Sequence, residues 1–283
     1  MVIKMNRLLL LPVLLLTLVV GKPAFSADFQ KGVSAYEKGD FATALRQWTP
    51  LAEQGYAYAQ HNIGVMYDKG QGVAQNYKTA VVWYKLAAVQ GDAPAQYNLG
   101  NLYRKGKGVP QSYKAAIKWY KLAAEKGHTS AQHNLGVMYD KGQGVAQDHK
   151  VSIKWYKLAA VPGDATAQYN HGNLSAAQYN LGNMYRKGEG VPQNHETSFK
   201  WYKLAAEQGH TTAQYNLGVM FNNGTGTFHD YTFAHMWMNI AVLQGYEDVG
   251  NKIDLVEKNM TPTQLGTAQR LTRECVAKNY KGC

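Results

Sequence analysis

The sequence has little of what most active sites and metal sites require. Only two of the 283 residues are cysteine, which excludes cysteine-rich disulfide scaffolds and zinc sites built from four cysteines. The motifs S-x-x-K, G-x-S-x-G, H-E-x-x-H and C-x-x-C do not occur. The histidine pairs His128/His133 and His229/His235 are five and six residues apart, so neither pair places two metal ligands on one helical face. We therefore expect no enzyme, no catalytic residue, no cofactor and no metal.

Long apolar runs are also missing, except near the amino terminus. Residues 8–20 carry no charge, and Lys4 and Arg7 precede them. Ala24 and Ser26 supply small side chains at the two positions that a signal peptidase reads. A helix over this run reaches about 20 Å, short of the ~30 Å hydrocarbon core of a membrane. The pattern predicts a signal peptide over residues 1–26, no transmembrane span after cleavage, and a periplasmic or secreted protein.

The charge is strongly basic, with a formal net charge of +11. The predicted signal peptide contains Lys4, Arg7 and Lys22 but no acid, so its removal leaves about +8. A basic balance is typical of partners such as an anionic membrane, an acidic cell-wall polymer or nucleic acid. Export argues against nucleic acid. Many lysines also recur in the last turn of a predicted helix, where a cation stabilises the helix dipole.

The two cysteines, Cys275 and Cys283, lie close together near the carboxyl terminus. An even number of cysteines in an exported chain predicts a disulfide. Closing so short a loop stabilises the fold by about 2–3 kcal/mol on the chain-entropy model.

A repeat of 36 residues runs through most of the chain. It is visible in the tryptophans at 83, 119 and 155 and again at 201 and 237, with one wider gap of 46 residues between 155 and 201. Glycine pairs keep the same spacing, from Gly70/Gly72 to Gly224/Gly226. A period of this length is typical of a solenoid. The glycine pairs lack the preceding strand and third glycine of a nucleotide-binding loop.

Each repeat predicts two helices. In the first, apolar residues at positions 59, 63, 66 and 67 form one stripe, and Gly70 ends the helix. In the second, positions 80, 84, 87 and 88 form a stripe that tryptophan widens. Gly91 ends this helix and Asp92 can cap the next one.

This pattern resembles the SEL-one-like repeat (SLR) family, relatives of the tetratricopeptide repeat. The resemblance covers roughly residues 28–245, and in one repeat it rests on these residues: Ala95, Leu99, Gly100, Tyr103, the run G-K-G-V-P-Q at 106–111, Trp119, Tyr120 and A-A-E-K-G at 123–127. It implies an all-α, right-handed α/α superhelical solenoid with the first helices on its concave face. The family mostly serves as adaptors that hold other proteins, often in bacterial envelopes.

The expected organisation has about six helix pairs plus carboxyl-terminal capping helices. After the signal peptide, an amino-terminal capping pair covers residues 27–55. The repeats cover residues 56–91, 92–127, 128–163, 164–209 and 210–245. Residues 246–283 form the carboxyl-terminal cap with the disulfide, and Thr261-Pro262-Thr263-Gln264 supplies an N-cap, a proline at N1 and glutamine at N3 of a final helix.

The fourth repeat carries a ten-residue insertion, because A-Q-Y-N at 167–170 returns at 177–180. In one straight helix, ten residues rotate the second copy by about 1000°, so both copies cannot face the core. His171 and Ser175 also replace core residues of the first copy. We therefore predict that residues 165–175 project as a short helix or irregular loop, and that core packing resumes at Ala177.

Neighbouring repeats differ most along one stripe of the first helix. His61, Val65 and Asp68 of one repeat become Tyr97, Asn101 and Arg104 of the next, at i, i+4 and i+7. We expect this stripe and an adjacent asparagine column to form a concave binding face. Its predicted residues are His61, Asn62, Val65, Asp68, Tyr97, Asn98, Asn101, Arg104, His133, Asn134, Val137, Asp140, Tyr179, Asn180, Asn183, Arg186, Tyr215, Asn216, Val219 and Asn222.

Both features also have a structural interpretation. The alternating charges at 68, 104, 140 and 186 would lie about 10 Å apart and could pair with one another. The asparagines could bond to a neighbouring turn.

The leading hypothesis for function is an exported scaffold that binds a protein or peptide along its concave face. The alternative is a binder of cell-wall saccharide or peptide, which would use the tyrosine and asparagine rows and the basic charge. A cysteine-rich branch of the family has been labelled with β-lactamase activity, a minor alternative here because these repeats contain no cysteine.

Overall fold

The structure is a computed structural model that describes residues 27–161, 167–247 and 252–283. The predicted signal peptide, residues 1–26, lies outside the described residues, as does the start of the predicted insertion at 165–166. The described chain is built of helices, with no strand among its described residues.

The helices alternate between a first and a second member of each pair. The first helices are α1 (Ala27–Glu37), α3 (Ala57–Lys69), α5 (Ala93–Lys105), α7 (Thr129–Lys141), α9 (Ala167–Lys187) and α11 (Thr211–Asn223). The second helices are α2 (Phe41–Glu53), α4 (Tyr77–Val89), α6 (Tyr113–Glu125), α8 (His149–Ala159), α10 (His195–Glu207) and α12 (Tyr231–Leu243). Two more, α13 (Lys252–Glu257) and α14 (Pro262–Ala277), follow the last pair.

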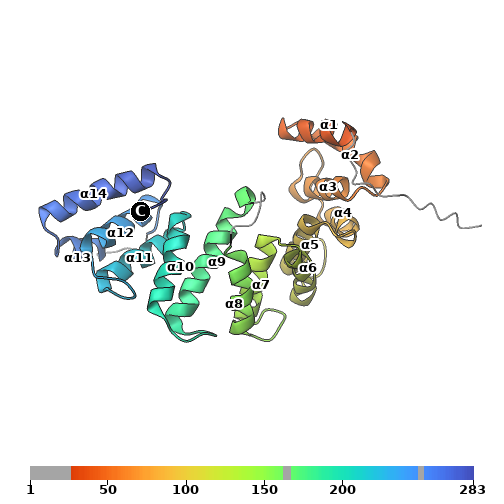
Figure 1. Cartoon of the computed structure of the whole chain (residues 1–283). Coiled ribbons are helices and arrows are strands. Elements are labelled where there is room, and N and C mark those ends of the chain that lie inside the picture. Colours follow the sequence, from red (N-terminus) through yellow and green to blue (C-terminus); the bar gives the residue numbers. More distant parts are fainter. Residues whose placement is uncertain (1–26, 162–166, 248–251) are drawn as a thin grey trace, which may run out of the picture.

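Consecutive helices pack side by side into a curved row, with α1 and α2 at one end and α12 to α14 at the other (Figure 1). The described residues thus form an all-α solenoid of six helix pairs followed by two further helices, as the sequence and its family resemblance predict. Small core clusters repeat between neighbouring pairs rather than merging into one globular core.

Glycine and small polar residues set the helix ends as the sequence predicts. Gly70 and Gly106 adopt left-handed conformations, with φ of 71° and 68°, and their N–H groups bond to carbonyls of the last turn. The Asp92 carboxylate accepts a hydrogen bond of 2.7 Å from the Ala95 N–H at the start of α5. Thr261 and Gln264 form the predicted capping box of α14.

A close contact between a glycine of the first helix and a large side chain of the second fixes the helices of each pair, and in the four middle pairs that side chain is tyrosine. A Cβ built on Gly100 would lie 2.7 Å from the Tyr120 ring, and one on Gly136 would lie 2.6 Å from the Tyr156 ring. Tyr120 is fully buried, so its ring lies against the α5 backbone. Glycine is needed at this position because any side chain would collide with the ring.

A buried glutamine fixes each first helix to the preceding pair. The amide of Gln60 donates a hydrogen bond of 2.9 Å to the Ala52 carbonyl at the end of α2, and Gln96 donates one of 2.9 Å to Ala88 at the end of α4. Carbonyls of a helix's last turn have no partner within the helix, so the glutamine column satisfies them. The repeating Ala-Gln pair in the sequence therefore has a structural role.

The insertion differs from the prediction, because α9 is one continuous helix of 21 residues. Core packing does resume at Ala177, which is fully buried. The preceding turn is not a free projection, since Leu174 and Ser175 are 7% and 4% exposed. The prediction of a separate short helix or loop was therefore wrong. The first of the two sequence copies continues the helix and contacts α7, where Asn173 Nδ2 donates a hydrogen bond of 2.8 Å to Ser130 Oγ.

The carboxyl-terminal helices cover the last repeat. α14 packs on α12, and the predicted disulfide between Cys275 and Cys283 is present. Tyr246, after α12, stacks on Tyr215 of α11 with ring centroids 4.8 Å apart. Tyr215 is only 7% exposed and belongs to the terminal core cluster. Its assignment to an accessible binding face was therefore wrong.

Candidate functional site

A hollow of about 740 Å³ lies on the first-helix side of the amino-terminal half. Its walls come from α1, α3, α5, the start of α7, and α9, with the aromatic rings of Trp48 and Tyr84 from second helices. The lining residues are Val33, Tyr36, Glu37, Trp48, His61, Asn62, Val65, Asp68, Lys69, Tyr84, Pro94, Tyr97, Asn98, His128, Ser130 and Asn173. This surface is mostly aromatic and neutral polar, with few charges.

The buried tyrosines turn their hydroxyls toward the binding stripe of the first helices. The Tyr84 hydroxyl lies 3.4 Å from the Asp68 carboxylate. Tyr120 instead donates a hydrogen bond of 2.7 Å to Asn101 Oδ1 and accepts one of 3.2 Å from Arg104 Nε. Burial raises the pKa of Tyr120 to about 12, even though Arg104 opposes this shift. The hydroxyls therefore stay protonated and act as fixed hydrogen-bonding groups.

These contacts contradict the predicted charge ladder along the first helices. Asp68 and Arg104 each contact a tyrosine of their own pair, and Arg186 Nε donates a hydrogen bond of 3.2 Å to the Tyr202 hydroxyl. Asp140 pairs with His149 of α8 at 2.9 Å. No ion pair joins these four charged residues to one another in the described structure. The ladder is missing because each of these charged residues finds a partner on the second helix of its own pair, a tyrosine hydroxyl for Asp68, Arg104 and Arg186 and a histidine for Asp140.

The asparagine column links successive first helices. Asn98 Nδ2 lies 3.2 Å from His61 Nε2, and Asn180 Nδ2 lies 3.5 Å from His133 Nε2. The predicted bonds to a neighbouring turn were wrong for Asn98 and Asn180, because the ring nitrogen of the preceding first helix is their partner. Asn98 and Asn180 thus have a structural role, although Asn98 also lines the hollow.

Histidine rings cover part of the tyrosine row. The His128 ring stacks on Tyr97 with centroids 4.6 Å apart, while its Nδ1 accepts a hydrogen bond from the Ala131 N–H at the start of α7. Burial lowers the pKa of His128 to about 4 and that of His133 to about 4. Burial also lowers the pKa of His61, although the Asp92 carboxylate opposes the shift. All three histidines are therefore neutral at physiological pH.

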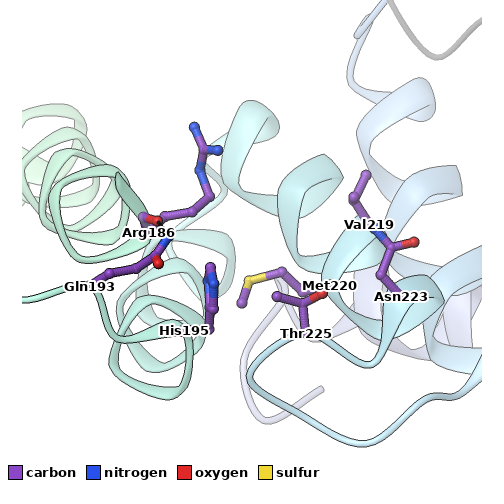
Figure 2. Close-up of a pocket in the computed structure, with 7 residues that line it drawn as sticks. All are labelled: Arg186, Gln193, His195, Val219, Met220, Asn223 and Thr225. Carbon is purple, nitrogen blue, oxygen red and sulfur yellow. Dashed lines mark hydrogen bonds between the residues drawn. The ribbon is translucent and has the colours of Figure 1, made fainter. Parts of the chain in front are cut away.

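The structure divides the predicted binding residues into groups. His61, Asn62, Val65, Asp68, Tyr97 and Asn98 share the hollow. Arg186 and Val219 line a second, smaller pocket of about 270 Å³. Figure 2 shows Arg186 and Gln193 on one side of this pocket, Val219 and Asn223 on the other, and His195 between them. The other predicted residues, Tyr215 excepted, are partly exposed along α5, α7, α9 and α11.

Sequence reasoning missed the two ends of the hollow. Val33, Tyr36 and Glu37 come from α1, for which the sequence predicts only a capping role. The pair Gly32-Val33 matches Gly64-Val65 of α3, and each glycine lies against an aromatic ring of the next helix. That match could have revealed the role of α1. The other end is formed by Asn173 in the insertion, for which no sequence pattern gave a signal.

No group of three or more His, Cys, Asp or Glu side chains that could hold a metal ion occurs in the described ranges. Among the same residues, no helix is both long enough and apolar enough to cross a membrane.

Comparison with known proteins gives one family. The model of the Sel1 repeat matches residues 57–92, 93–128, 129–160, 175–210 and 211–246, and so passes over most of the inserted segment. A Sel1 repeat protein from Oxalobacter formigenes is 31% identical, covers 78% of this chain and 87% of its own, and has a TM-score of 0.71. A search among curated proteins finds no match.

Two further solved structures are similar at lower TM-scores. A protective antigen present in uropathogenic Escherichia coli strains, displaying an SLR fold, is 28% identical over 89% of this chain and 69% of its own, with a TM-score of 0.37. A Sel1 repeat protein from Klebsiella pneumoniae subsp. pneumoniae is 24% identical over 75% of this chain and 98% of its own, with a TM-score of 0.44.

Sel1 repeats typically form non-catalytic scaffolds for protein interactions. The five matched repeats cover more than half of the sequence, and the Oxalobacter protein is similar in both sequence and fold. The chain therefore belongs to the Sel1 repeat family.

Proposed function

We propose that this chain is an exported scaffold that binds a protein through an extended peptide segment seated in the hollow. The observation that carries the proposal is the hollow itself, which combines aromatic rings with amide and imidazole groups from successive first helices. Concave surfaces of this kind are how solenoids bind extended partners.

The spacing of the polar groups suits a peptide backbone. Asn62 and Asn98 occupy the same position on neighbouring first helices, and both line the hollow. Packed helices lie about 8–10 Å apart. Three residues of extended chain span about 10 Å. A peptide crossing the first helices therefore presents an amide group to each asparagine in turn.

The same surface is less suited to a saccharide. Sugars bind best to an aromatic face that is free, but the Tyr97 face is covered by His128, and the Tyr179 face is covered by His210 at 4.5 Å. Charges near the hollow are mixed, with Glu37 and Asp68 beside Lys69, so an acidic polymer gains little there. A peptide ligand accounts better for this chemistry than a cell-wall polymer does.

Two features support export to the periplasm or the extracellular space. Residues 1–26 have the order of a secretory signal. The disulfide between Cys275 and Cys283 fits an oxidising compartment. Processing can be checked by mass measurement of the protein recovered from cell fractions, with cleavage expected after Ser26.

The binding test uses a displayed library of unstructured peptides, followed by affinity measurement on each enriched peptide. We expect the double variant Y97A/N98A to weaken binding at least tenfold, because it removes one aromatic wall and one amide group of the hollow. The matched control is Y179A/N180A, which changes the same repeat positions where they do not line the hollow. Their surroundings are alike, since Tyr97 and Tyr179 both stack on a histidine.

Purified peptidoglycan and a chromogenic β-lactam serve as parallel probes. Equal loss of peptide binding in both double variants would remove the hollow from the site. Binding of peptidoglycan that only Y97A/N98A abolishes would replace the peptide by a cell-wall ligand. Hydrolysis of the β-lactam by the purified protein would contradict a purely non-catalytic scaffold.

A further inference from the structure

The positive charge of the chain is concentrated on three neighbouring second helices. Together α4, α6 and α8 hold eight lysines and one glutamate, a net charge of +7. The first helices of the same repeats, α3, α5 and α7, hold four basic and two acidic residues, a net charge of +2. Helix-dipole stabilisation accounts for the lysines at first-helix ends, but not for this excess.

The lysines share one exposed stripe with apolar residues. In α4 the stripe is Lys78, Val82, Lys85, Leu86 and Val89, at i, i+4, i+7, i+8 and i+11, and every member is exposed. The same positions hold three lysines, a leucine and Glu125 in α6. In α8 they hold three lysines and a leucine, and a valine follows the helix. We call these three stripes, which occupy equivalent positions of successive repeats, the lysine face.

The lysine face has few internal charge partners. Of its eight lysines only Lys121 has an ion pair in the described structure, at 4.0 Å with Glu125. In α10 the equivalent lysines are neutralised, since Lys200 pairs with Glu196 at 2.7 Å and Lys203 with Glu207 at 3.8 Å. The unbalanced charge is therefore specific to the middle of the solenoid.

Apolar side chains lie between these lysines and reach far into solvent. Val89 is 65% exposed, Val161 is 62% exposed, and Leu122 and Leu158 occupy the same repeat position at 37% and 54%. Lysines flanking exposed aliphatic residues match the interface of a bilayer, where cations meet lipid headgroups and apolar groups reach the acyl chains. A dissolved polyanion would use the lysines but would gain nothing from the aliphatic residues.

We propose that the lysine face docks the protein on an anionic lipid bilayer. Each lysine close to such a surface contributes a factor of about five in partitioning. Tyr84, which lines the hollow, lies on the opposite side of α4 from the stripe. A docked molecule therefore keeps its hollow directed away from the lipid and free for a partner. This inference does not depend on what occupies the hollow.

The test measures co-sedimentation of residues 27–283 with vesicles of phosphatidylcholine containing about 30 mol% phosphatidylglycerol, with pure phosphatidylcholine vesicles as the neutral comparison. We expect K118E/K154E to lower partitioning about 25-fold or more. The control K200E/K203E changes the charge equally on α10 and should lower it less than threefold. All four side chains are substantially solvent-accessible, so thermal unfolding should stay near that of the parent protein.

A third variant separates a bilayer from a polymer. L122S/L158S keeps the charge, and we expect it to reduce vesicle binding several-fold while leaving binding to dissolved polyglutamate unchanged. The proposal is overturned if neutral vesicles bind equally well, or if K118E/K154E binds anionic vesicles like the parent. It is also overturned if L122S/L158S has no effect on vesicle binding, because the face would then recognise anionic charge alone.

Discussion

Two tyrosines at the same position of the repeat, Tyr97 in α5 and Tyr215 in α11, have different surroundings in the amino-terminal and carboxyl-terminal halves of the first-helix row. Tyr97 lines the open hollow and stacks on His128. Tyr215 is covered by Tyr246, and its hydroxyl accepts a hydrogen bond from Lys252. The repeat fixes where a side chain points, whereas the segment that follows the repeat decides whether a ligand can reach it.

The two ends also differ beneath the surface. In the amino-terminal repeats a tyrosine lies against the glycine of the first helix, and its hydroxyl joins the polar stripe, as Tyr120 does beside Gly100. In the last repeat the equivalent of Tyr120 is Met238, which lies against Gly218. A thioether cannot provide the same hydrogen bonds. The row of buried tyrosine hydroxyls that bond to the first helices therefore does not continue into the last repeat.

The largest expected effect is acid destabilisation of the amino-terminal half. The pKa values of His128 and His133 are about 4 in the fold, below their ordinary value of 6.5. Between these values the unfolded chain binds more protons, so stability is complete above pH 6.5 and falls as the pH drops to 4. Each histidine contributes on the order of 3 kcal/mol to this loss.

Hydrogen exchange followed by mass spectrometry at pH 7 and pH 4.5 checks this difference between the ends. Protection should fall first in α3, α5 and α7, which carry or adjoin His61, His128 and His133. In the carboxyl-terminal half burial also lowers the pKa of His210, at the start of α11, but three such histidines lie in the amino-terminal half. Loss of protection that begins in α11 and α12 would contradict the prediction.

The second prediction compares the two tyrosines by truncation. Tyr215→Ala should lower the free energy of unfolding by about 3–5 kcal/mol, because it empties a buried site in the terminal cluster. Tyr97→Ala should cost less than about 2 kcal/mol, because part of that ring already faces solvent. Denaturant titration measures both variants. Equal losses would mean that the terminal segment does not cover Tyr215 in solution.

The sequence predicted the helix boundaries and the buried sides of the helices well, because residues within each helix and at its ends determine them. Glycines such as Gly70 stop first helices, Asp92 caps α5, and the alanine and tyrosine stripes choose the buried sides. The polar contacts were less predictable. Asp68 and Arg104 looked like partners for each other, but a period does not reveal that a buried phenol lies nearer to each of them.

The insertion was mispredicted for a related reason. The rotation argument assumed that both sequence copies compete for the core. In the structure the helix runs through both copies, and the first copy contacts α7 through Asn173 while the adjacent Leu174 is buried. A helix can extend past the edge of a solenoid whenever its neighbour offers such a contact. Neither that contact nor the closed end of the hollow could be predicted from the repeat.

The third prediction concerns the disulfide at the covered end. Replacing Cys275 and Cys283 with serine should lower the free energy of unfolding by about 2–3 kcal/mol, because the crosslink shortens the unfolded chain by a small loop. Since the loop lies far from the hollow, affinity for any peptide bound there should not change. Thermal unfolding and peptide titration on the same sample separate these effects. A loss of affinity would show that the two ends are coupled.

The smallest expected effect tests the helix that closes the hollow. Gly172 lies within α9, and a Cβ built on it would meet nothing within 4 Å. Alanine is favoured over glycine in a helix by up to about 1 kcal/mol, so Gly172→Ala should raise the free energy of unfolding by a few tenths to 1 kcal/mol. Gly100→Ala provides the contrast, because its Cβ would lie 2.7 Å from Tyr120 and should destabilise by about 1–3 kcal/mol. A destabilising Gly172→Ala would mean that the insertion is not helical at this residue, and that Asn173 does not form the end of the hollow.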